Sequence, residues 1–147
     1  MHALFVKSLS VAIFFLTGGD AASPPNKQGE LQVQLSGWTA AEGSVLLAVY
    51  DRSEDFLSEN RYRELAVPLT SREPLTVRVG GLPFGRYAIS AFHDANDNAE
   101  LDTNFLGIPK ESYGFSNNAR GRFGPPSFEQ AAFEFDTAAK QISIDLR

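Results

Sequence analysis

Hydrophobic and polar residues alternate in several short runs along the chain. Leu31, Val33 and Leu35 alternate with polar residues, which predicts a strand with one buried face. Residues 43–50 (GSVLLAVY) are more continuously apolar and predict a second strand. Because the turn-like sequence AAEG separates these two runs, we predict that they form a hairpin.

Further runs predict the next three strands. Residues 61–69 predict a weaker third strand, and Pro68 places it at a sheet edge or strand end, because proline cannot donate a hydrogen bond to a neighbouring strand. Residues 75–79 (LTVRV) alternate and predict the fourth. A tight turn at 81–85 leads into a fifth strand, where Tyr87, two residues after a glycine, resembles the tyrosine corner of antiparallel sandwiches.

The last part of the chain predicts one helical turn and two strands. Ser127 is a candidate N-cap for a turn over residues 127–132 (SFEQAA), with Gln130 at the capping-box position. Residues 132–136 and 141–147, joined by TAAK, predict a closing pair of strands. Seven short strands without long amphipathic helices predict an all-β, seven-stranded antiparallel Greek-key sandwich, immunoglobulin-like or transthyretin-like, with one long ordered loop.

The beginning of the chain differs in composition from the rest. One lysine is followed by an apolar run at residues 8–17 and by small residues, which predicts a signal peptide over residues 1–22. We expect a flexible leader at residues 23–29 and one β-sandwich domain at 30–147. The apolar run is too short for a membrane span. These features predict a periplasmic or secreted protein, expected to be a monomer.

Charge and cysteine content exclude several classes of function. The chain has a net charge of −5, which argues against a general nucleic-acid or anionic-membrane surface, because phosphate binding needs clustered Lys and Arg. It contains no cysteine, so neither a disulfide nor a lipid-modified cysteine can stabilise or anchor it.

An acidic and amide-rich stretch, HDANDNAELD at residues 93–102, follows the fifth predicted strand. Oxygen-bearing side chains occur there at alternate positions, which is the pattern of calcium loops. The candidate Ca²⁺ ligands are Asp94, Asn96, Asn98, Glu100 and Asp102. The loop departs from an EF-hand, because Ala99 replaces the usual glycine and Phe105 replaces the last glutamate. Since Asp and Asn also favour solvated turns, both interpretations stay open.

Catalytic residues are sparse. His93 beside Asp94 allows a small secreted hydrolase, with Asp94 or Asp102 as the partner carboxylate. The only other histidine lies in the predicted signal peptide, and no cysteine or G-x-S-x-G nucleophile motif is present. We therefore expect His93 to be structural and the protein not to be an enzyme.

Residues 104–135 combine aromatic side chains with Gly, Pro and Asn, which is typical of an ordered loop rather than a disordered one. Such loops often carry function. The candidate binding surface comprises Tyr113, Asn117, Asn118, Arg120 and Arg122.

The motifs GLPFGRYAI and FHDANDNAELDTNFLGIPKESYGFSNNARGRFGPPSFEQAAF resemble a family of exported bacterial proteins, Domain of Unknown Function family 2141. The resemblance covers residues 30–147 and implies a secreted or periplasmic β-sandwich with no established activity. The family favours glycine at the positions of Asp97 and Ala99, where this chain departs from it.

The sequence thus favours an exported, non-enzymatic β-sandwich module, with a candidate structural Ca²⁺ loop and a binding surface for a glycan, peptide or other envelope or extracellular ligand. The small hydrolase and a purely structural envelope protein are the alternatives.

Overall fold

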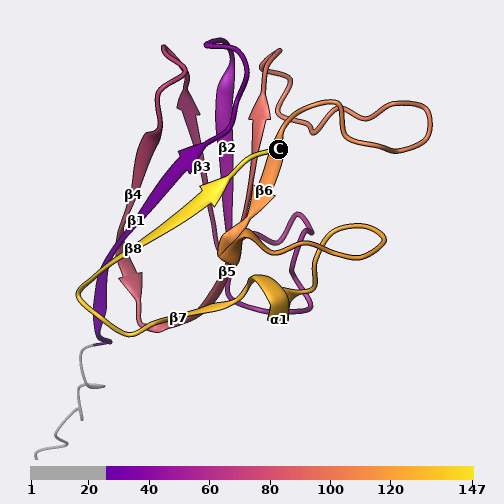
Figure 1. The fold of residues 1–147 in the computed structure, drawn as a ribbon. Coiled ribbons are helices and arrows are strands. Elements are labelled where there is room, and N and C mark those ends of the chain that lie inside the picture. Colours follow the sequence, from indigo (N-terminus) through magenta and orange to yellow (C-terminus); the bar gives the residue numbers. More distant parts are fainter. Residues whose placement is uncertain (1–25) are drawn as a thin grey trace, which may run out of the picture.

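The computed structural model describes residues 26–147, so the predicted signal peptide and residues 23–25 of the leader lie outside the described residues. These residues form two β-sheets and little helix (Figure 1). One sheet has the strand order β4-β1-β8, and the other has the order β3-β2-β5-β6, with β7 paired to β5. The elements are β1 (Gln28–Ser36), β2 (Ser44–Tyr50), β3 (Arg63–Pro68), β4 (Leu75–Pro83), β5 (Gly85–Asp94), β6 (Tyr113–Phe115), η1 (Ser116–Asn118), α1 (Phe128–Ala131), β7 (Phe133–Phe135) and β8 (Ala139–Asp145).

The alternation in the sequence places the main core between the two sheets. Leu31, Val33 and Leu35 of β1 are fully buried, and they belong to the same hydrophobic cluster as Val45 and Leu47 of β2. A second, smaller cluster covers the other face of β2 and is formed by Ala48, Tyr50, Ala88, Phe115, Phe128 and Ala131. Since β2 is buried on both faces, its sequence is almost continuously apolar.

The predicted hairpin between the first two strands is wrong. β1 pairs with β4 and β8, whereas β2 pairs with β3 and β5 in the other sheet. The AAEG segment therefore connects the two sheets instead of turning within one. The apolar faces of β1 and β2 still meet, but they meet across the core and not side by side in a ladder.

The predicted count of seven antiparallel strands also needs correction. Eight strands lie within residues 26–147, because the three-residue β6 falls in the segment predicted as a long loop. β8 pairs with β1 in parallel. The predicted closing pair is wrong too, since β7 pairs with β5 while β8 pairs with β1, so TAAK crosses between sheets.

Two local predictions, the tyrosine corner and the capping box, are confirmed. The hydroxyl of Tyr87 donates a hydrogen bond to the Pro83 carbonyl oxygen at 2.7 Å, as in a tyrosine corner. α1 has a complete capping box, because the Ser127 side chain accepts from the Gln130 N–H and the Gln130 side chain accepts from the Ser127 N–H. Within residues 26–147, no helix is long and apolar enough to cross a membrane.

Candidate functional site: the acidic loop and the β6–β8 pocket

The acidic loop begins where β5 ends, and Asp94 organises it. Asp94 is only 2% exposed. Its carboxylate accepts hydrogen bonds from the backbone N–H groups of Asn98 at 3.1 Å and Ala99 at 2.8 Å. These bonds curl the chain through positive φ angles, 56° at Asp97 and 61° at Ala99. Ala99 therefore adopts the left-handed conformation that glycine accepts more easily.

Two further carboxylates, those of Asp102 and Glu111, also accept hydrogen bonds from this loop. The Asp102 carboxylate accepts the side-chain amides of Asn96 at 2.7 Å and Asn98 at 2.9 Å. Glu111 accepts the backbone N–H groups of Ala95 and Asp102, both at 3.0 Å. The loop is thus a set of turns closed by carboxylates.

The structure brings together four of the five predicted metal ligands, Asp94, Asn96, Asn98 and Asp102. The fifth, Glu100, is exposed and joins them only by donating its backbone N–H to the Asn98 side chain. Among residues 26–147, no group of three or more His, Asp or Glu side chains is arranged to hold a metal ion. In this arrangement the carboxylate oxygens accept hydrogen bonds from N–H groups, which fits a hydrogen-bonded turn better than a metal site. The Ca²⁺ site stays a prediction.

His93, the candidate catalytic histidine, is 4% exposed. Its Nε2–H donates to the Glu42 carbonyl oxygen at 2.8 Å, since a carbonyl can only accept. The neighbouring Asp94 carboxylate is bonded to loop N–H groups. In this arrangement His93 ties the end of β5 to the segment before β2.

The sequence block GFSNNARG folds into β6, η1 and the turn after them. A Cβ at Gly114 would lie 2.9 Å from the Asp145 carbonyl oxygen, so only glycine lets β6 approach β8 this closely. Ser116 is fully buried; its hydroxyl accepts the Ile89 N–H and donates to the Ala131 carbonyl oxygen. This serine therefore joins β5, η1 and the end of α1.

The two asparagines of this block have different roles. Both adopt positive φ angles, 61° at Asn117 and 46° at Asn118, a conformation that asparagine tolerates better than most residues. The Asn117 amide donates to the carbonyl oxygens of Gln130 and Ala132. The Asn118 side-chain oxygen accepts the Asp145 N–H at 2.9 Å, which ties η1 to β8.

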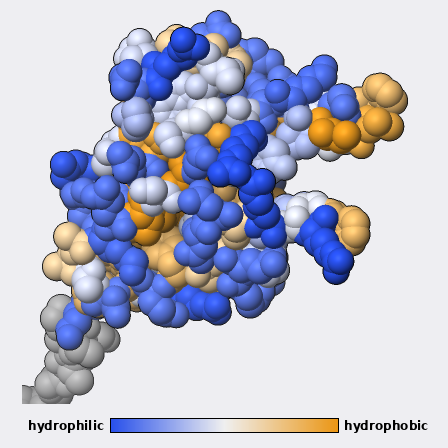
Figure 2. All heavy atoms as spheres, in the orientation of Figure 1, coloured by the Kyte–Doolittle hydropathy of each residue, from blue (hydrophilic) through white to orange (hydrophobic). Residues whose placement is uncertain are grey.

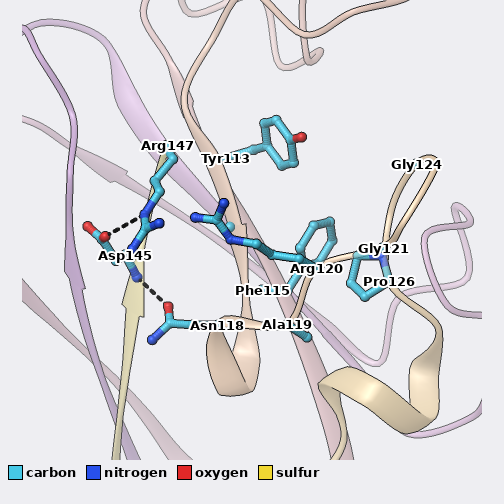
Figure 3. Close-up of a pocket in the computed structure, with 11 residues that line it drawn as sticks. Tyr113, Phe115, Asn118, Ala119, Arg120, Gly121, Gly124, Pro126, Asp145 and Arg147 are labelled. Atoms are coloured by element: carbon cyan, nitrogen blue, oxygen red, sulfur yellow. Dashed lines mark hydrogen bonds and ion pairs between the residues drawn. The ribbon is translucent and has the colours of Figure 1, made fainter.

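A pocket of about 200 Å³ opens between β6, the turn after η1 and the end of β8 (Figure 3). Tyr113 and Arg147 exchange two backbone hydrogen bonds, which place Arg147 beside the start of β6. In Figure 3 the Arg120 side chain points from the turn toward the side where Arg147 lies. The lining residues are Tyr113, Gly114, Phe115, Asn118, Ala119, Arg120, Gly121, Gly124, Pro126, Asp145 and Arg147.

The charged residues that line this pocket are two arginines, Arg120 and Arg147, and one aspartate, Asp145. Arg147 forms an ion pair with Asp145 at 2.9 Å. The ion pairs found among residues 26–147 do not include Arg120. The Tyr113 and Phe115 rings meet edge to face with centroids 5.9 Å apart. The pocket therefore combines an aromatic wall with two guanidinium groups, one of which has no carboxylate partner in this part of the chain.

Three of the five residues predicted for the binding surface line this pocket: Tyr113, Asn118 and Arg120. The other two do not, because Asn117 bonds to the backbone around α1 and the Arg122 guanidinium lies over the Phe123 ring at 5.8 Å. Arg147 also lines the pocket and was not predicted from the sequence. No local pattern marks it, since only the backbone pairing of Arg147 with Tyr113 brings it to the pocket.

The fold and the pocket together define a mostly β, two-sheet domain with a basic, aromatic-lined cavity at one sheet edge. Residues 33–143 match a family described as an uncharacterized protein conserved in bacteria. The chain belongs to this family, Domain of Unknown Function family 2141, which confirms the resemblance noted in its motifs. No curated protein and no solved structure is detectably similar to it.

Proposed function

We propose that this protein is an exported, non-enzymatic β-sandwich module of Greek-key type that binds a small acidic ligand in the β6–β8 pocket. The observation that carries the proposal is the convergence of Arg120, Arg147 and Tyr113 on one cavity. A guanidinium group recognises a carboxylate through charge-assisted hydrogen bonds, and an aromatic ring provides a surface for an apolar sugar face. An acidic sugar, free or at the end of a glycan, combines both features.

The test uses glucuronate as the probe, glucose as the neutral control, and the chain from Ser23, which removes the predicted signal peptide. Binding is measured by titration of backbone amide NMR signals. We expect glucuronate to shift signals around residues 113–120, and glucose to bind more weakly. Arg120→Gln should weaken glucuronate binding about tenfold or more, because a hydrogen bond to a charged group contributes about 1.5–3 kcal/mol. Equal binding of glucose and glucuronate would overturn the proposal.

Arg52→Gln is the matched control for this titration. Arg52 is exposed and does not line the pocket, so its loss changes the net charge by the same amount without touching the proposed site. If both variants weaken binding equally, the effect comes from net charge, and the pocket has no specific role.

The non-enzymatic part of the proposal is supported by the environment of His93. A general base needs a ring nitrogen within reach of substrate, whereas His93 is only 4% exposed and its Nε2–H is bonded to a backbone carbonyl, which leaves little of the ring open to a substrate. The hydrolase alternative predicts hydrolysis of p-nitrophenyl acetate that His93→Ala abolishes. Such a loss, with the fold retained by circular dichroism, would overturn the non-enzymatic assignment.

The Ca²⁺ loop is a second and separate proposal. The observation that favours it is that Asp102 draws the side chains of Asn96 and Asn98 together. Rotating these two amides would exchange their NH₂ groups for oxygens, the ligands that Ca²⁺ prefers. If so, thermal unfolding in millimolar Ca²⁺ should occur a few degrees higher than in excess EDTA, and Asp102→Asn should reduce this shift. Equal midpoints in Ca²⁺ and EDTA would leave only a hydrogen-bonded turn.

A further inference from the structure

Two loops project from the same side of the molecule, and each presents apolar side chains at its tip (Figures 1 and 2). The first, residues 103–110, exposes Phe105, Leu106 and Ile108. The second, residues 119–126, exposes Phe123. Phe105 is 95% exposed and Phe123 is 96% exposed, so neither ring packs on the domain. Large apolar side chains this exposed are uncommon in a soluble domain and usually mark a contact surface.

The first tip is held in a defined shape. Thr103 and Pro109 form an isolated antiparallel bridge, and the Asn104 N–H donates to the Ile108 carbonyl oxygen at 2.8 Å. The Asn104 side-chain oxygen accepts the N–H groups of Leu106 at 2.9 Å and Ile108 at 3.0 Å. The loop is thus a closed hairpin in which the backbone polar groups bond inward and the apolar side chains face outward.

The second tip is a tight turn. A Cβ at Gly121 would lie 2.1 Å from the Gly124 carbonyl oxygen, so the two sides of the turn are in contact. The Arg122 guanidinium lies 5.8 Å from the centroid of the Phe123 ring, which keeps a positive charge beside the apolar tip.

Charge is distributed unevenly around these tips. Lys110, Arg120 and Arg122 lie in the two loops, and neither 103–110 nor 119–126 contains an acidic residue. The nearest acidic residues, Asp102 and Glu111, use their carboxylates to accept N–H groups of the acidic loop. The two tips therefore carry only positive charges, three in all, although the acidic loop beside the first tip is negative and the whole chain has a net charge of −5.

We propose that these two tips insert into a bilayer surface containing anionic lipid headgroups, so that the protein docks peripherally with the basic residues at headgroup level. Apolar loop tips flanked by Lys and Arg match the two layers of such a surface, the acyl boundary and the anionic headgroups. A hydrophobic groove of a partner protein would not need basic residues on both loops. Arg120 is shared with the acidic-sugar pocket, but the apolar side chains at the two tips do not line that pocket, so this proposal does not depend on sugar binding.

The test is co-sedimentation of the chain from Ser23 with vesicles. This chain keeps strands β1 to β8 and lacks the apolar segment at residues 8–17. We expect binding to equimolar phosphatidylglycerol–phosphatidylcholine vesicles, little binding to pure phosphatidylcholine, and release in about 0.5 M NaCl. Each of Phe105→Ala and Phe123→Ala should weaken binding about tenfold. Because both rings are exposed, the thermal midpoint of the variants should match that of the parent.

Leu57→Ala is the control, because Leu57 is an exposed apolar residue on a different loop, 51–60. Equal weakening by this variant, equal binding to neutral vesicles, or no binding to either vesicle would overturn the proposal. Concentration-dependent self-association that Phe105→Ala abolishes, without vesicle binding, would assign the tips to a second copy of the chain.

Discussion

Replacing Ala99 by glycine should stabilise the protein. Ala99 has a φ angle of 61°, and its side chain is exposed, so removing the methyl group costs little buried surface. An L-residue in this conformation loses about 1–2 kcal/mol relative to its right-handed form, a loss that glycine avoids. Glycine also gives the unfolded chain more conformational freedom, which cancels about 0.4–1 kcal/mol of this gain in stability. The net expectation is a gain of about 0.5–1 kcal/mol, or about 2–6 °C in the thermal midpoint.

The assay is thermal unfolding followed by circular dichroism, with urea titration to give the free energy. Ala95→Gly is the matched control in the same loop, because Ala95 is half-buried and is not among the positive-φ residues. There the same substitution should destabilise by about 0.5–1 kcal/mol. A midpoint for Ala99→Gly at or below that of the parent would refute the reasoning, and with it the left-handed geometry of the loop.

Three other substitutions test the packing around the pocket and core. Burial raises the pKa of Tyr87 to about 12, with Tyr62 and Asp51 adding to the shift. The neutral phenol therefore contributes stability that is fully present below about pH 10 and is lost as pH rises toward 12. Tyr87→Phe should lower the free energy of unfolding by about 1 kcal/mol at pH 7, because it removes the hydrogen bond to Pro83. The loss of stability between pH 10 and 12 should also disappear in this variant, which urea titrations at several pH values will show. Ser116→Ala leaves the Ile89 N–H and the Ala131 carbonyl without their partner, and urea titration should show a loss of about 2–4 kcal/mol; a loss below about 0.5 kcal/mol would contradict the buried network. Gly114→Ala should separate β6 from β8 and lower the thermal midpoint by several degrees, whereas an unchanged midpoint would contradict their close approach.

Local structure could be predicted from the sequence where the signal is itself local. The capping box of α1 needs only Ser127 and Gln130, three residues apart, and both of its hydrogen bonds form. Alternation in β1 identified its buried face, since Leu31, Val33 and Leu35 are fully buried. The tyrosine corner likewise depends on residues only four apart, Tyr87 and Pro83.

Strand pairing and the pocket could not be predicted in this way. The alternation of apolar and polar residues is the same whether β1 pairs with β2 in one sheet or faces it across the core. The sequence pattern therefore could not distinguish a hairpin from the observed arrangement. β6 was missed because it has only three residues and its burial depends on neighbours from β5 and β8. Arg147 enters the pocket only through that pairing.

The parallel pairing of β1 with β8 has a consequence for how the chain folds. Val33 lies opposite Ile142 in the register, so the middle strand of that sheet gains its second neighbour from a segment more than a hundred residues later. Until residue 145 has emerged from a ribosome or a translocation pore, one edge of β1 has no partner strand and the β6–β8 pocket lacks one wall. If the chain is exported, as proposed, the order of its strands delays completion of the fold. The delay helps to keep the chain unfolded while it crosses the translocation pore.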